Sequence, residues 1–172
     1  MVAMQFTDEV VWSWFDVLVM GLLLFGAGTA FVLISRRGPG TTYRVAVGLA
    51  VASTLLLIWM NLAVGIIGAE DNPANLLYAG VVAVELVGIG LARLRPHGMQ
   101  RALLATAAAQ FLVPVTALIV WRPPLDTADA VMGVMGVFIL NSFFVALFVA
   151  AALLFRRARR SASAPPDAAG AS

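Results

Sequence analysis

Residues 59–78 of the chain read WMNLAVGIIGAEDNPANLLY. In this stretch an apolar run that contains one amide, Asn61, leads into a dense acidic and amide turn, and another apolar run follows directly. This order is typical of two membrane-crossing helices joined by a short connection. The stretch therefore predicts a helical hairpin in lipid, and it is the first place to look for specific chemistry.

The composition of the whole chain favours a membrane protein. Of its 172 residues, 62% are hydrophobic and 12% are charged, against about 45 to 50% and about 25% in ordinary soluble domains. A globule of this size keeps much of its surface in water, so it cannot hide such an apolar excess. The chain has no cysteine, which excludes disulfides, thiolate metal sites and cysteine nucleophiles.

Five apolar runs are of a length suited to crossing a hydrocarbon layer about 30 Å thick, at about 1.5 Å of helix rise per residue. We expect an all-α, integral membrane bundle of five transmembrane helices that forms one domain over residues 1–160. The expected helices cover approximately residues 12–34, 45–68, 75–93, 102–121 and 130–155. Residues 161–172 are polar and rich in Ala and Pro, and we expect a disordered cytoplasmic tail there.

Small and weakly polar residues recur in the second run at steps of three, four or seven residues. They are Ala46, Ala50, Thr54, Asn61, Gly65 and Gly68. Such a stripe indicates either a packing seam, because close helix approach in lipid needs small residues, or a ligand groove. We favour the seam.

The arginines predict the orientation of the bundle. All eleven basic residues are Arg, and ten of them would lie on one side of the membrane. These ten are Arg36, Arg37, Arg44, Arg93, Arg95, Arg101, Arg156, Arg157, Arg159 and Arg160. The positive-inside rule then places the N-terminus outside and the C-terminus in the cytoplasm. Arginines at helix ends, rather than in one patch, argue against a nucleic-acid partner.

Four stretches of the chain carry a resemblance to a known family. They are MQFTDEV (4–10), WMNLAVGIIGAEDNPAN (59–75), ARLRPHGMQRALLATAAAQ (92–110) and LNSFFVALFVAAALLFRRA (140–158). Together they resemble an uncharacterised family of proteobacterial multi-pass membrane proteins. The resemblance implies a bacterial inner-membrane protein and brings no activity. Members often carry a further apolar segment ahead of the first stretch and a small residue at Glu85, so the chain departs from the pattern at both places.

Glu85 is the acid that most needs an explanation. Counted from Asn75, it lies roughly 15 Å deep, near the bilayer centre. An ionised carboxylate there costs at least about 2.5 to 3.5 kcal/mol, so the side chain should face the bundle, find a partner or stay protonated. Gln110 and Asn141 lie at a similar depth and are candidate partners. Glu85 is a proton or cation site, a protonated group that hydrogen-bonds between helices, or a side chain that faces a water-filled crevice without a role.

The turn after the second run has two interpretations. Asn72 suits a helix N-cap, Pro73 suits the first helical position, and Asn75 is placed at the third. Glu70 and Asp71 stand just upstream, where the helix dipole favours acids. Capping explains these residues without a ligand, but the same turn, with Asn61 below it, could also bind a cation, a lipid head group or a partner. Two adjacent acids are a weak metal signal.

Other polar residues carry weaker predictions. Asp126 and Asp129 resemble an acidic capping pair for the fifth helix. His97 is the only histidine, and we place it in a basic cytoplasmic loop. We predict no catalytic residues, no cofactor-binding residues and no metal site, because the residues provide no nucleophile, metal or cofactor signature.

Three classes of function therefore remain for the chain. We favour a non-catalytic accessory or interaction protein of the inner membrane, which would bind a membrane-protein partner or form a homo-oligomer within the lipid bilayer. The alternative is a small proton- or cation-coupled transporter or channel that uses Glu85 and an acidic outer face. A membrane enzyme is the least favoured class.

Overall fold

The structure is a computed structural model that describes residues 14–38, 40–68, 71–122 and 127–162. These residues form helices and their connections, with no strand among them. The helices are α1 (Trp14–Ser35), α2 (Gly40–Ala63), the 3₁₀ turn η2 (Pro73–Leu76), α3 (Leu77–Ala92), α4 (Pro96–Trp121) and α5 (Ala128–Ala162). With η2 and α3 taken together, the described chain has five spans long and apolar enough to cross a membrane. The predicted all-α fold is confirmed, and the five spans are compatible with a multi-pass membrane protein.

Helices α2, α4 and α5 extend beyond their apolar runs, so the predicted boundaries are wrong at these helix ends. α2 begins at Gly40 rather than near residue 45, and α4 begins at Pro96 rather than near residue 102. Proline suits a first helical position because its missing N–H has no partner there in any case. His97 consequently lies in the first turn of α4, not in a loop.

The fifth helix runs through the basic segment to Ala162, so the predicted tail start at residue 161 is wrong. Arginines in a last helical turn favour its continuation because they complement the helix dipole. Residues 163–172 lie outside the described residues. At the N-terminal end of α5, Ala130 N–H donates to Thr127 Oγ1 at 3.2 Å, so Thr127 caps the helix. Asp126 is outside the described residues, and Asp129 lies in the first turn.

α2 is shorter than predicted at its C-terminal end. It stops at Ala63, and Gly65 and Gly68 then take left-handed backbone angles, with φ of +66° and +69°. Glycine reaches this region without the steric cost that a Cβ brings. The predicted small-residue stripe is therefore only partly correct. Ala46 and Ala50 are buried on α2, whereas the two glycines belong to the turn.

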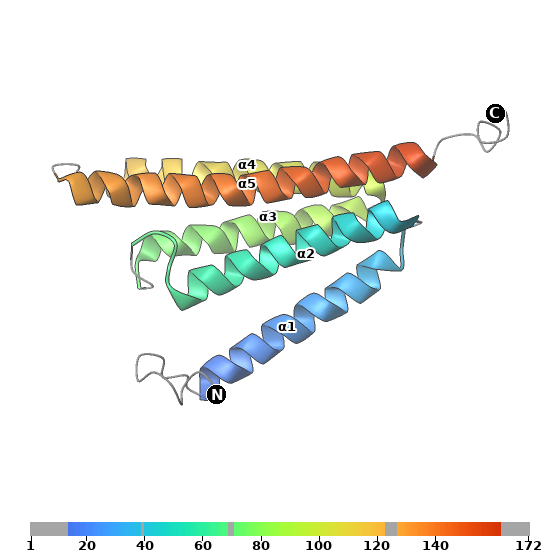
Figure 1. Cartoon of the computed structure of the whole chain (residues 1–172), viewed down its shortest axis with the longest axis horizontal. Coiled ribbons are helices and arrows are strands. Elements are labelled where there is room, and N and C mark those ends of the chain that lie inside the picture. Colours follow the sequence, from blue (N-terminus) through green and yellow to red (C-terminus); the bar gives the residue numbers. More distant parts are fainter. Residues whose placement is uncertain (1–13, 39, 69–70, 123–126, 163–172) are drawn as a thin grey trace.

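Helices α2 to α5 form the packed bundle, and α1 lies at its side (Figure 1). α4 packs along α5 and α3, while α2 packs along α5 and makes far less contact with α3. α1 leans mainly on α2 near the turn that joins them and diverges from it towards its own N-terminal end (Figure 1). Its membrane span is 0% buried inside the protein. The described part of the first predicted helix is thus the least embedded span.

The centre of the bundle is aromatic. Phe144, Phe148 and Phe155 of α5 are all fully buried. The ring of Tyr43 on α2 meets Phe155 edge-on, with ring centroids 5.2 Å apart, a preferred geometry for aromatic pairs. The Tyr43 hydroxyl continues to the α3–α4 connection, where it donates to the Leu94 carbonyl at 2.9 Å.

Two glycines set the close approach of α3 and α4. A Cβ on Gly88 of α3 would lie 2.8 Å from Ala102 Cβ on α4, and one on Gly98 of α4 would lie 2.7 Å from Ala92 Cα on α3. Both distances are shorter than side chains tolerate, so each helix uses a glycine to admit the backbone of the other. Each glycine faces an alanine on the opposite helix.

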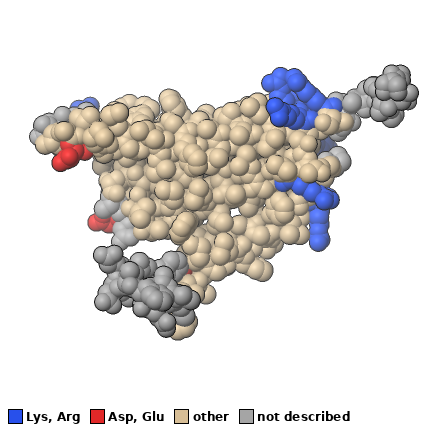
Figure 2. All heavy atoms as spheres, viewed as in Figure 1, with Lys and Arg blue, Asp and Glu red and all other residues tan. Residues whose placement is uncertain are grey.

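Charge is separated along the bundle. Arginine side chains gather at the end where α2 begins and α5 finishes, while the visible acids lie at the opposite end (Figure 2). The surface between these two ends is uncharged in this view. An uncharged belt between charged ends is what lipid around the helices requires.

We predict that Gly88→Leu lowers the stability of the bundle, because overpacking a close contact typically costs about 1 to 3 kcal/mol. The matched control is Gly90→Leu on the same helix, where an added Cβ meets nothing within 4 Å. Unfolding of both purified variants in detergent, followed by circular dichroism, measures the difference. Equal unfolding midpoints would show that α3 and α4 are not in tight contact at Gly88.

Candidate functional site

A cleft of about 290 Å³ opens between α1, α2 and α3. It exists because α1 diverges from the bundle and because α2 and α3 touch each other so little. Leucine, isoleucine, valine, methionine, alanine and glycine side chains line it almost entirely. The polar exceptions are Thr54 of α2 and Glu85 of α3.

Glu85 is buried, with 3% of its surface exposed. Its Oε2 lies 2.7 Å from Thr54 Oγ1, and that hydroxyl oxygen also lies 2.9 Å from the Ala50 carbonyl oxygen. A threonine hydroxyl has one hydrogen and can fully satisfy only one of these acceptors. Both contacts are complete hydrogen bonds when Glu85 is a neutral acid that donates to Thr54, while Thr54 donates to Ala50. The geometry therefore fits a protonated carboxyl group.

The second carboxyl oxygen of Glu85 is different. Oε1 makes no hydrogen bond within the part of the chain that the structure describes, and the side chain lines the cleft. A polar atom without a partner in an apolar environment costs free energy. An occupant of the cleft that offers a hydrogen bond at this point would recover that cost.

Gln110 and Asn141, the predicted partners of Glu85, bond to each other instead. Gln110 Nε2 donates to Asn141 Oδ1 at 2.9 Å, and Asn141 Nδ2 donates to the Tyr78 hydroxyl at 2.9 Å and to the Val137 carbonyl at 2.8 Å. The prediction that these two amides bond to Glu85 is therefore wrong, since among the described residues Glu85 bonds to Thr54. This network joins α3, α4 and α5 in the core, where the Gln110 Oε1 atom has no hydrogen-bond partner in the described part of the chain.

The predicted caps of the turn are confirmed. Asn72 is the N-cap of η2, its Oδ1 accepts from Ala74 N–H at 2.9 Å, and Pro73 follows at the start of the helical turn. Asp71 is exposed, and Glu70 lies outside the described residues.

Asn75 does more than occupy a helical position. It is 5% exposed, and its Oδ1 accepts from the N–H groups of Ile66 and Ile67 at 3.1 and 2.9 Å. Asn61 Nδ2 donates to the Asn75 carbonyl at 3.4 Å, while Asn61 Oδ1 is buried and has no hydrogen-bond partner among the described residues. The side chain of Asn75 thus holds the end of the second apolar run against the start of the third, as hairpin rigidity requires.

The predicted polar cluster therefore separates into three places. Asn61, Asn72 and Asn75 lie together at the turn, Glu85 faces the cleft, and Gln110 with Asn141 lies in the core. Within the described ranges, no three His, Asp or Glu side chains come close enough to hold a metal ion.

Thr54 and Tyr78 bond to residues of the predicted cluster, but they were not predicted as site residues. Thr54 was assigned to a packing stripe and Tyr78 was only the end of the quoted stretch. A signal for Thr54 was present, because counting back from Ala63 puts it roughly 14 Å deep, close to the depth of Glu85. Tyr78 lies seven residues before Glu85, and this spacing alone gives no sign of its bond to Asn141.

Comparison with known proteins gives no assignment. The chain matches no protein-family model, no curated protein and no solved structure. The resemblance to the proteobacterial family therefore stays a prediction from the residues. A function has to be inferred from the geometry of this chain.

We predict that Asn141→Leu destabilises the protein by about 1 to 2 kcal/mol, because it leaves Gln110 and Tyr78 without their shared partner. The control is Ser142→Ala, which removes an exposed hydroxyl bonded only to the Phe138 carbonyl of its own helix. Reversible unfolding in mixed detergent micelles measures both variants. Two variants of equal stability would mean that the network contributes nothing.

Proposed function

We propose that the chain is a multi-pass protein of the bacterial cytoplasmic membrane, with its N-terminus outside and its C-terminus in the cytoplasm. The five apolar spans support a membrane location. The gathering of arginines at the end where α5 finishes supports the orientation, because basic residues are retained on the cytoplasmic side (Figure 2). The source and the particular membrane follow from the family resemblance.

Within that membrane, we propose a non-catalytic accessory role in which the cleft at Glu85 binds a transmembrane helix of a partner protein. The observation that carries this proposal is the Glu85 Oε1 atom, which makes no hydrogen bond with any described residue and lies in a cleft whose lining is apolar apart from Thr54 and Glu85. In lipid, side-chain hydrogen bonds between helices contribute to association because hydrocarbon offers no alternative partner. A Ser, Thr, Asn or Gln side chain on the partner helix would supply the missing bond.

The α1 side of the cleft supports the same proposal. Gly26, Ala27 and Ala30 line it there, and small side chains of this kind allow two helix backbones to approach closely. A Cβ on Gly26 would meet nothing within 4 Å, so this position is open. Since α1 makes its main contacts with α2, it has room to adjust to a helix placed between itself and α3.

A proton- or cation-coupled transporter is the second candidate, and the one-hydrogen geometry at Thr54 favours it. A protonated acid near the middle of a span is a frequent element of proton relays. The remaining lining of the cleft is apolar, however, so Glu85 is not connected to either end by polar side chains of the cleft. For this reason we place the accessory role first.

We predict that a photo-crosslinking residue at Ala27, in the cleft, captures a discrete partner in native membranes, whereas the same residue at Phe25, an α1 side chain that does not line it, captures mostly lipid. Glu85→Leu should reduce the protein adduct at Ala27 several-fold, and Glu85→Gln should retain it because an amide still forms hydrogen bonds. Gel electrophoresis and mass spectrometry of the adducts measure this. An adduct that the chain forms with a second copy of itself would identify a homo-oligomer.

Equal protein adducts from Ala27 and Phe25, or insensitivity to Glu85→Leu, would contradict a binding site in the cleft. The transporter is tested separately by pH-driven flux in proteoliposomes. Flux in the wild type that disappears in Glu85→Gln, without a partner adduct, would reverse the order of the two candidates.

A further inference from the structure

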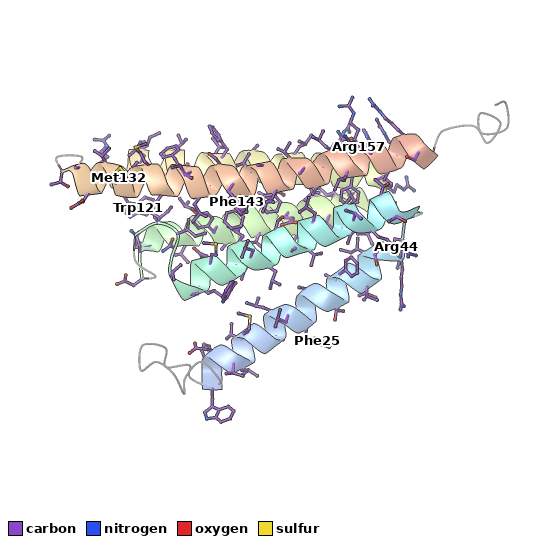
Figure 3. All side chains as sticks on the ribbon, in the orientation of Figure 1. Phe25, Arg44, Trp121, Met132, Phe143 and Arg157 are labelled. Atoms are coloured by element: carbon purple, nitrogen blue, oxygen red, sulfur yellow. The ribbon has the colours of Figure 1, made fainter. Side chains whose placement is uncertain are left out.

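A second surface feature lies at the basic end of the bundle, away from the cleft. It is a groove of about 450 Å³ between the start of α2 and the end of α5, which pack side by side. Thr41 and Thr42 of α2 form one wall, and Arg157 and Arg160 of α5 form the other. Figure 3 shows Arg157 and Arg44, which belong to these two helices, at the same end of the molecule.

The groove changes character along the helix axes. Val45 lines it one turn deeper on α2 than Thr41, and Leu154 lines it one turn deeper on α5 than Arg157. Hydroxyl and guanidinium groups therefore stand at the rim, and aliphatic side chains stand on the side of the apolar belt. A ligand that fits both levels has an anionic group joined directly to an apolar body.

The arginines of α5 are divided between two faces. Arg159 Nη1 lies 2.9 Å from His97 Nδ1 on α4, and the guanidinium must be the donor because arginine has no acceptor. Arg157 faces the groove and makes no side-chain hydrogen bond or ion pair with the residues that the structure describes. Arg157 and Arg160 are three positions apart, which places them next to each other on one helical face.

The first turn of α2 adds to the anionic preference of the groove. The first N–H groups of a helix have no partner within the helix, and its dipole is positive at this end. The hydroxyls of Thr41 and Thr42 are further donors in the same turn. Arginine is also suited to phosphate, since its planar fork donates two parallel hydrogen bonds.

We propose that this groove is a binding site for an anionic phospholipid. The phosphate is held at the rim by Arg157, Arg160 and the first turn of α2, and the glycerol and acyl chain lie on Val45 and Leu154. The apolar lower level favours a lipid over a soluble phosphate. The site depends on the chain lying in a membrane, but it does not depend on the proposed partner of the cleft.

Two double variants that have the same net charge as each other test the site. Arg157→Gln with Arg160→Gln removes the two groove arginines, and Arg156→Gln with Arg159→Gln removes two arginines of the same helix at the same spacing outside the groove. Native mass spectrometry of protein extracted with phosphatidylglycerol measures the retained lipid. We expect the groove double variant to bind phosphatidylglycerol roughly tenfold or more weakly, and the control to resemble the wild type.

A third variant fills the groove without changing its charge. Val45→Trp should also lose the lipid although every arginine remains, and Leu153→Trp, at an exposed position of α5 that does not line the groove, should retain it. Should the groove double variant fail to fold, this pair still decides the question. Thermal unfolding with added lipid gives an independent measurement, because a ligand of the folded state raises the unfolding temperature.

Four results would overturn the proposal. One is an equal loss of lipid from both double variants, which would mean that the arginines act only through total charge. Another is retention of the lipid by Val45→Trp. A third is stabilisation by inorganic phosphate or glycerol phosphate as large as that by phosphatidylglycerol, since the site would then not select a lipid. The fourth is equal binding of phosphatidylcholine, since the site would then not select an anionic lipid.

Discussion

Hydrogen bonds at three levels join α2 to α3 and to the segments at the two ends of α3, and the rest of the structure depends on these bonds. They are Tyr43 to Leu94, Thr54 to Glu85 and Asn61 to Asn75. These two helices touch little through apolar contact, whereas α3 packs closely on α4 and α2 packs closely on α5. Lipid tails are as apolar as the side chains of the helices, so helices in lipid gain little free energy from burying hydrocarbon. Hydrogen bonds between helices therefore contribute more to their relative positions. The three hydrogen bonds hold α2 beside α3, where close helix packing is missing.

The way in which α2 is joined to α3 also explains where the candidate site lies. Because α2 and α3 are bridged rather than packed, Glu85 comes to the edge of the bundle and faces the space that α1 leaves open. One carboxyl oxygen contributes to the bridge and the other remains for an occupant of the cleft. The buried network around Asn141 differs in this respect, since it lies inside the packed part of the bundle and joins three helices to one another. We interpret that network as structural and the Glu85 position as the site of binding.

The basic end of the bundle has more than one physical role in this description. Arginine beyond an apolar span favours the cytoplasmic side, and the helix dipole favours cations at the end of α5. Neither role explains why Arg159 contacts His97 while Arg157 lines a groove with an aliphatic lower level. Side-chain direction on one helix separates these residues although their sequence context is the same. An anionic lipid in the groove would give the second face a role that charge alone does not require.

The sequence by itself determined the features that depend on local composition. Apolar length predicted five spans, and side-chain chemistry predicted the caps at Asn72 and Pro73, because an N-cap and a first-turn proline act within a few residues. Helix ends were predicted less well, since α4 begins before its apolar run and α5 continues beyond its own, in both cases through basic residues. Only the tertiary structure decided the partners of Glu85 and Asn141, the divergence of α1 and the sorting of the arginines. The physical reason is that a helix in lipid is apolar on every face, so its periodicity does not reveal which side meets a neighbour.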